Sequence, residues 1–198
     1  MKRQLSYLKA LVICHGKSEK QMCDYIKSNL RIRIEVISDK NGEKSIQITS
    51  IKKFLNGLFF KNSKSFRNRF EDIEESNTKT KIPDNFKVFI IMDTDDCTEE
   101  QRTEFINKNM FKDIWLYDFI VPIYNTPCLE SVLQKSGINF ESTGRNQKKE
   151  YIKIFPTDKN YIKSDTIQVS DFAKNLRQCK NTNLYEFIEF CLDIAHNC

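Results

Sequence analysis

Residues 86–92, with the sequence FKVFIIM, constrain the fold more than any other part of this chain. Six of these seven residues are apolar. A short apolar run of this kind is typical of a strand that is covered on both faces. Directly after it come three carboxylates within four residues, in the sequence DTDD at 93–96. The pattern predicts a buried strand that ends in a cluster of negative charge.

Strand-like and helix-like patterns alternate along the chain. Strands are expected over residues 7–14, 32–37, 86–92 and 115–124. Helices are expected over residues 18–30, 49–60, 66–73, 98–109, 127–134, 169–176 and 184–194. This alternation predicts an α/β fold with a mostly parallel sheet and helices on both faces. We expect an α/β core over residues 1–136, with a basic loop and C-terminal helices packed on it over residues 137–198.

Two of the expected strands are followed directly by residues that can bind a metal or transfer a proton. The first ends at Cys14 and is followed by His15, Gly16 and Lys17, and residues 86–92 are followed by the aspartates. Ligands of open parallel sheets bind at the carboxyl ends of the strands. The sequence therefore predicts that these two strand ends converge to form a site.

The aspartates are candidate metal ligands. Asp93, Asp95 and Asp96 repel one another unless a cation neutralises them. Mg²⁺ binds to one or two carboxylates and completes its shell with water and substrate phosphate. We therefore expect Mg²⁺ (or Mn²⁺) at these three residues. The alternative is an acidic turn before a helix, where negative charge is favourable without a metal.

The glycine turn supplies the candidate catalytic groups. Gly16 allows close backbone approach, and His15 can transfer protons near neutral pH or be an ordinary surface histidine. Lys17 would stabilise phosphate charge, and Glu19 lies in the first turn of the following helix. Glu130 opens a later helix near the same sheet edge, either to support the site or to complement the helix dipole.

Positive charge is concentrated in the first half of the chain. Residues 1–81 hold 18 Lys or Arg against 9 Asp or Glu, whereas the whole chain has a net charge of +5. Basic groups interleaved with aromatic rings can bind phosphates and stack on bases. Solvated faces, and core packing for the rings, are the alternatives. The candidate nucleic-acid contacts are Lys52, Lys53, Lys61, Lys64, Arg67, Arg69, Lys148 and Lys149.

Cysteine usage and hydropathy bear on the cellular compartment. The seven cysteines contain no C-x-x-C pair, and Cys14 and Cys23 occupy core-like positions. This spacing favours reduced thiols over zinc or a disulfide framework. The longest apolar runs are too short to cross a membrane, and the basic N-terminus lacks the apolar core of a secretory signal. We expect a cytoplasmic protein without membrane contact.

The two strand ends together resemble the TOPRIM domain of topoisomerases, primases and old-family nucleases. The resemblance consists of a strand ending in a glycine turn with Glu19, followed far downstream by a strand ending in D-x-D-D. The segment NTPCLESVL at 125–133 is similar to the N-P-x-x-E helix start of the RloB-like branch. Proteins of this branch are small and are associated with bacterial anti-phage defence. The resemblance covers about residues 7–135.

The resemblance implies a TOPRIM-like (Rossmannoid) fold and magnesium-dependent cleavage of nucleic acid, either DNA or RNA. Asp93 and Asp95 match the family's D-x-D metal ligands, and Gly16 matches the turn glycine. His15 stands where the family has a glutamate, whereas Glu19 matches a second acid of the small members. A protein partner encoded in the same defence operon, and self-association, are compatible with this family.

Two further hypotheses remain open at the level of sequence. The first is a catalytically degenerate TOPRIM module that binds nucleic acid, a nucleotide or a protein without turnover, because His15 cannot replace a carboxylate at magnesium. The second is a domain like that of response regulators, whose acidic strand end also binds Mg²⁺. It requires a phosphoacceptor aspartate and a lysine at later strand ends, and neither is convincingly placed.

Overall fold

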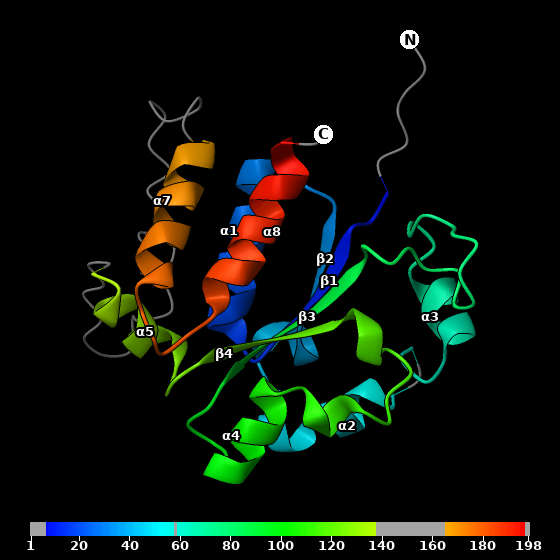
Figure 1. Ribbon diagram of the computed structural model, residues 1–198, viewed down its shortest axis with the longest axis horizontal. Helices are drawn as coiled ribbons and strands as arrows, with labels where there is room; N and C mark the ends of the chain where they lie inside the picture. The colour runs from blue at the N-terminus through cyan, green and yellow to red at the C-terminus, as the bar shows by residue number, and fades with distance from the viewer. Residues whose placement is uncertain (1–6, 58, 138–164, 197–198) are drawn as a thin grey trace.

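The computed structural model describes residues 7–57, 59–137 and 165–196. Its centre is a sheet of four parallel strands in the order β2–β1–β3–β4 (Figure 1). The strands are β1 (Ala10–Cys14), β2 (Ile34–Ile37), β3 (Lys87–Asp93) and β4 (Ile120–Asn125). The α/β class with a parallel sheet, as predicted, is therefore confirmed.

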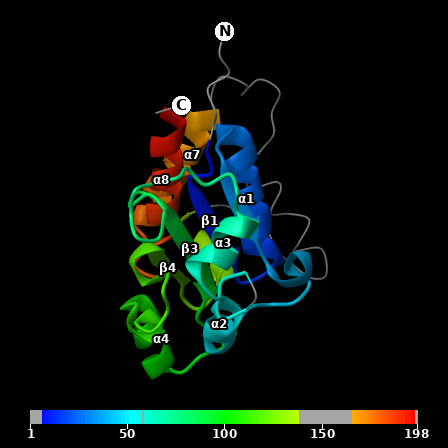
Figure 2. The same ribbon diagram turned by 90° about the vertical axis from the view of Figure 1, so that its right-hand side faces the viewer.

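Helices cover both faces of this sheet, as the two perpendicular views show (Figures 1 and 2). One face carries α1 (Lys17–Leu30), α5 (Leu129–Lys135), α7 (Asp165–Arg177) and α8 (Leu184–His196). The other carries α2 (Ile48–Leu55), α3 (Ser63–Arg69), α4 (Glu99–Ile106) and the short 3-10 turns Asn109–Phe111 and Tyr117–Phe119. Among the described residues, no helix has the length and apolar character needed to cross a bilayer.

Strand alternation divides the buried side chains into two cores. Along β1, Ala10, Val12 and Cys14 join the cluster beneath α1, whereas Leu11 and Ile13 join the cluster beneath α2. Successive side chains of a strand point to opposite faces, so both faces of β1 must be apolar. Along β3 the same alternation places Phe89 and Ile91 in the first cluster and Val88, Ile90 and Met92 in the second.

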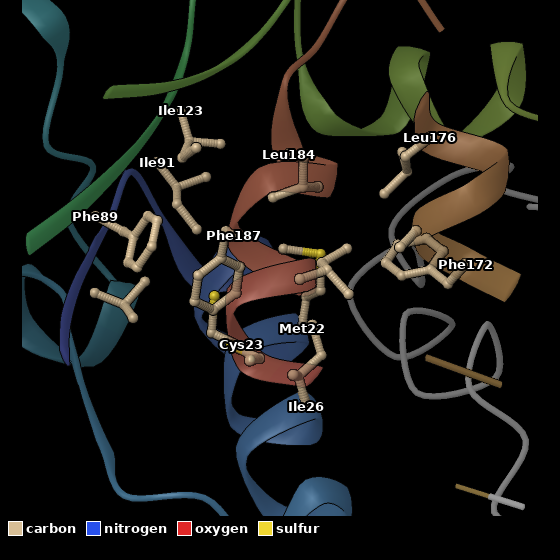
Figure 3. Close-up of a cluster of buried hydrophobic side chains, with 14 of the residues drawn as sticks. Met22, Cys23, Ile26, Phe89, Ile91, Ile123, Phe172, Leu176, Leu184 and Phe187 are labelled. Atoms are coloured by element: carbon tan, nitrogen blue, oxygen red, sulfur yellow. The ribbon is translucent and has the colours of Figure 1, made fainter. Parts of the chain in front are cut away.

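The two C-terminal helices complete the first core. In Figure 3, Phe187 of α8 points toward the sheet between Phe89 of β3 and Cys23 of α1. The rings of Phe89 and Phe187 lie 5.2 Å apart in an edge-to-face arrangement, which is favourable for aromatic pairs. Phe172 and Leu176 of α7 belong to the same cluster. These helices therefore share one hydrophobic core with residues 10–133.

Several predicted boundaries shift in the structure. Residues 115–119, predicted as strand, precede β4 instead, because the indole of Trp115 donates a hydrogen bond to the Phe60 carbonyl at 2.6 Å and Tyr117–Phe119 forms a 3-10 turn. The helix predicted at 66–73 is α3 (Ser63–Arg69), whose start is capped by the Asn62 side chain. This side chain accepts a hydrogen bond from a backbone N–H, an interaction that favours helix initiation.

The outer edge of β4 is closed by the connection between α7 and α8. The side-chain amide of Asn183 donates to the Pro122 carbonyl at 3.0 Å, and its oxygen accepts from the Tyr124 N–H at 2.9 Å. The Thr126 N–H donates to the Asn181 carbonyl. Pro122 itself has no N–H, which suits an edge strand. This edge is therefore shielded from pairing with another strand.

Replacing Asn183 with Ala should destabilise the protein, because two backbone groups of β4 lose their partners. Leaving partly buried groups unpaired costs about 1–3 kcal/mol of unfolding free energy. Urea denaturation measures the change. Asn68→Ala, at an exposed position of α3, is the matched control and should change stability by less than ~0.5 kcal/mol. Equal stability of the two variants would contradict this role of Asn183.

Candidate functional site

The candidate site lies where the winding of the sheet reverses. The chain passes from β1 to β2 on one side and then returns to place β3 on the other side of β1. Doubly wound sheets bind ligands at such a switch point, outside the carboxyl ends of the strands. Cys14 pairs with Ile91, so continuing this register by two residues places Gly16 beside Asp93. The two predicted strand ends therefore meet.

Glu19 is held in the site by the glycine turn. Helix α1 begins at Lys17 with Gly16 as its N-cap, one residue before the predicted start at residue 18. The Gly16 N–H donates to Oε2 of Glu19 at 2.9 Å, and only 2% of Glu19 is exposed. A carboxylate at the third helical position that accepts this N–H satisfies one of the unpaired donors of the helix start. The turn thus fixes an acid inside the site.

Asp93 ends β3 and is almost completely buried, with 6% of its surface exposed. Its Oδ1 accepts a hydrogen bond from the backbone N–H of Leu129 at 3.1 Å and one from the Asn125 amide at 3.4 Å. Within the part of the chain that the structure describes, Oδ2 accepts none. The alternation of β3 turns Asp93 to the face of Phe89 and Ile91, which is the face that α1 covers.

Negative charge accumulates around Asp93. Burial, followed by the charges of Glu19 and Glu130, raises the pKa of Asp93 to about 9. Burial also raises the pKa of Glu19; its backbone hydrogen bond and the nearby His15 oppose this shift, and the charge of Glu130 adds to it. Among the described residues, none of these three acids forms an ion pair with Lys or Arg. The described part of the site therefore holds three acids without a Lys or Arg partner.

His15 and Asp96 form a second group near the same sheet edge. His15 directly follows the end of β1 and is half-buried. Burial raises the pKa of Asp96, and the nearby His15 opposes this shift. Neither Nδ1 of His15 nor the Asp96 carboxylate has a hydrogen-bond partner among the described residues. His15 therefore lies close enough to influence both Asp96 and Glu19.

The other candidate site residues lie at the margin of the Asp93 group. Strand β3 ends at Asp93, and Asp95 is exposed in the turn that follows. Glu130 is the second residue of α5 and is half-buried. Lys17, the first residue of α1, is exposed.

The turn at Asp39–Gly42 supports the glycine turn from outside. Gly42 has a φ of +84°, and a Cβ built on it would lie 2.7 Å from the Cα of Lys17. The Ile46 N–H also donates to the His15 carbonyl at 2.8 Å. This loop therefore packs directly on the backbone of residues 15–17. The sequence shows the turn but gives no sign of what it contacts.

Two buried polar residues of the site were assigned no role from the sequence. Asn125, the last residue of β4, is 0% exposed, and Thr182 is 3% exposed. The Thr182 hydroxyl donates to Oδ1 of Asn125 at 3.0 Å. An asparagine at a strand end could have drawn attention to residue 125. No local pattern marks Thr182, because it reaches the site from a connection 57 residues further along the chain.

Some of the residues predicted to contact nucleic acid make contacts within the protein, and others form no ion pair among the described residues. Lys52 pairs with Asp113, and Arg67 donates to the carbonyls of Ile73, Glu74 and Lys81. Arg69 lies over the rings of Phe59 and Phe70. Within the described chain, Lys53, Lys61 and Lys64 are exposed and form no ion pair. Lys148 and Lys149 lie outside the described residues.

The segment that contains α3 lies far from the acidic site. Residue Ile73, shortly after α3, bridges to Leu8, which precedes β1. This segment therefore meets the amino ends of the strands, whereas Gly16 and Asp93 mark the carboxyl ends. A strand the length of β3 spans roughly 20 Å. Most of the interleaved rings lie in the second core: Phe60, Phe66 and Phe70.

The acidic site does not contain a complete protein cage for a metal. Among the described residues, no three His, Cys, Asp or Glu side chains are grouped as a metal site. Mg²⁺ nevertheless binds commonly through one or two carboxylates, with water and phosphate as its other ligands. The free Oδ2 of Asp93 and the neighbouring acids fit this chemistry, because their charge lacks a cation.

No family model, curated protein or solved structure matches the chain. The structure itself establishes the α/β class and the parallel sheet.

Asp93→Asn should stabilise the protein in chelator at alkaline pH. An aspartate of the unfolded chain ionises near pH 4, whereas Asp93 ionises at about 9 in the folded chain. The folded wild type therefore loses stability as the pH rises between these values, and Asn cannot ionise. At about pH 8 we expect a gain of at least ~1.4 kcal/mol, the equivalent of one pKa unit. The gain should vanish near pH 4 in urea denaturation; one that is independent of pH would contradict this explanation.

Gly42→Ala should destabilise the protein and disturb the glycine turn, because the new Cβ would clash with Lys17. Gly137→Ala is the matched control, since Gly137 also has a positive φ (+71°) but has nothing within 4 Å of an added Cβ. Both variants incur the backbone strain of ~1–2 kcal/mol, and the clash should cost Gly42→Ala a further ~1–3 kcal/mol. Thermal denaturation compares them; equal losses would exclude the contact.

Proposed function

We propose that this protein is a metal-dependent nuclease of the TOPRIM type, which cleaves phosphodiester bonds of nucleic acid with Mg²⁺ or Mn²⁺. The observation that carries the proposal is the burial of Asp93 beside Glu19 and Glu130, with no Lys or Arg of the described residues paired to them. This cluster lies at the switch point of a parallel sheet, the position at which such sheets bind ligands.

The cation would be held by Oδ2 of Asp93 together with Glu19 and Glu130. Asp95, exposed beside them, would bind a water of the metal shell, and substrate phosphate would complete the coordination. When bound, the metal stabilises negative charge on the phosphate and lowers the pKa of a coordinated water.

The protein's own residues orient these groups. The Leu129 N–H and the Asn125 amide fix the Asp93 carboxylate, and the Gly16 N–H fixes Glu19. Fixed groups of this kind need no reorganisation when charge develops. Lys17, exposed at the start of α1, is available to contact the phosphate. His15 and Asp96, which lie near enough for His15 to influence the pKa of Asp96, are suited to carry a proton.

The position of Glu19 supports an active enzyme. The sequence departs from the TOPRIM pattern at His15, where the family has a glutamate. In this chain the acid that most strongly raises the pKa of Asp93 is Glu19, in the first turn of α1, four residues after His15. Glu19 therefore supplies a carboxylate to the metal site, and His15 remains free for proton transfer.

The second candidate is a degenerate TOPRIM module that binds nucleic acid, a nucleotide or a protein without cleavage. The observation in its favour is that Asp95 is exposed and that no three-residue metal group occurs within the described chain. The nuclease has nucleic acid as its partner, whereas the degenerate module has nucleic acid, a nucleotide or a protein; the cytoplasm is the proposed setting of either. By resemblance to the RloB-like branch, the setting is phage defence, with a protein partner from the same operon.

Cleavage of labelled DNA and RNA, single- and double-stranded, tests the proposal directly. We expect cleavage in Mg²⁺ or Mn²⁺, none in chelator, and a loss of at least ~100-fold in Asp93→Ala, because metal-bound charge stabilisation is lost. Asp84→Ala, at an exposed position before β3, is the matched control and should cleave like the wild type.

Two results would reject the nuclease. Cleavage that persists in chelator or in Asp93→Ala would show that the acidic site is not the catalyst. Binding of nucleic acid by the wild type with no cleavage in either metal would support the degenerate module instead.

A further inference from the structure

A continuous chain of hydrogen bonds joins the start of α8 to Asp93. The Leu184 N–H donates to the Thr182 hydroxyl at 2.9 Å, and Thr182 donates to Oδ1 of Asn125 at 3.0 Å. The Asn125 amide then donates to Oδ1 of Asp93 at 3.4 Å. All three side chains are buried, with exposed fractions of 3%, 0% and 6% in the order Thr182, Asn125, Asp93.

The hydrogen bonds of this chain all run toward Asp93. The Thr182 oxygen accepts from the Leu184 N–H, and its hydroxyl hydrogen is donated to Oδ1 of Asn125. Asn125 thereby presents its amide nitrogen to the carboxylate. In the opposite orientation the Asn125 carbonyl would face the Asp93 carboxylate, which is repulsive.

This orientation determines which oxygen of Asp93 is available. Two N–H donors hold Oδ1, one from Asn125 and one from Leu129. Oδ2 has no hydrogen-bond partner among the described residues and is left to bind a cation or a phosphate-bound water. Groups behind a metal ligand that fix its orientation commonly change metal affinity when they are removed.

We propose that Thr182 is a positioning residue of the Asp93 site, which acts by setting the amide orientation of Asn125. The expected effect on metal binding rests on the proposed function, whereas the hydrogen bonds themselves do not depend on it. The backbone around Thr182 is fixed independently, because residues 125 and 182 form a bridge and the Thr126 N–H donates to Asn181. The hydroxyl is therefore the part of Thr182 that the site requires, and the α7–α8 connection belongs to the site.

Binding of Mn²⁺ to the full chain, followed by the electron paramagnetic resonance signal of the free ion, tests this role. Thr182→Val keeps the shape of the side chain and removes the hydroxyl, whereas Thr182→Ser keeps the hydroxyl. We expect Thr182→Val to weaken Mn²⁺ binding by ~10–100-fold, the usual effect of removing a group behind a metal ligand. Thr182→Ser should stay within about threefold of the wild type, because it preserves the donor.

A control separates positioning from a loss of stability. Val169→Ala creates a cavity beneath α7, in the same hydrophobic core but not in the hydrogen-bonded chain, and should lower the melting temperature while leaving Mn²⁺ affinity unchanged. If Thr182→Val fails to fold, Thr182→Ala removes the same hydroxyl without adding a methyl group to the site. Equal weakening of Mn²⁺ binding in Val169→Ala and the hydroxyl-free variant would overturn the proposal.

A measurement without metal keeps the inference separate from the proposed function. The side-chain amide resonances of Asn125 in a ¹⁵N-labelled protein should move in Thr182→Val and stay in place in Thr182→Ser. Unmoved resonances in Thr182→Val would overturn the positioning role. A wild type that binds no Mn²⁺ but shows the expected shifts would overturn the metal function and support the orientation of Asn125 by Thr182. If the wild type and Thr182→Val bind Mn²⁺ equally tightly, the role of Thr182 is overturned and the proposed metal function stands.

Discussion

The parallel pairing of β1 with β3 is the interaction on which the rest of this structure depends. It brings the turn at Gly16 beside the end of β3, although Gly16 and Asp93 are far apart in the chain. Because the winding of the sheet reverses between these two strands, the helices that follow them, α1 and α4, cover opposite faces of the sheet. Burial and the neighbouring acids raise the pKa of Asp93, so its ionised form needs compensating positive charge.

Strand alternation then decides which residues can act together. Asp93 ends β3 on the face of the sheet that α1 covers, and Glu19 is the acid that acts most strongly on its pKa. His15, just beyond the end of β1, influences the pKa of both Glu19 and Asp96.

The C-terminal helices have two connected roles. Phe187 and its neighbours bury the face of the sheet beneath α1, and this packing holds the α7–α8 connection against β4. From that position Asn183 satisfies the edge of β4, and Thr182 reaches Asn125 behind Asp93. A segment that could be taken for an appendage from the sequence therefore contributes both to the core and to the site.

The sequence alone determined the class of the fold and one side of the site. The buried strand expected at residues 86–92, followed by carboxylates, is found as β3 (Lys87–Asp93), because periodicity and polarity report burial directly. Local patterns could not reveal the 3-10 turn at Tyr117–Phe119, where the Trp115 indole bonds to a distant carbonyl. Local patterns also could not show that Glu19 is the acid that acts most strongly on Asp93, or that Thr182 reaches the site. Those facts depend on which faces and loops meet, and long-range packing alone decides such contacts.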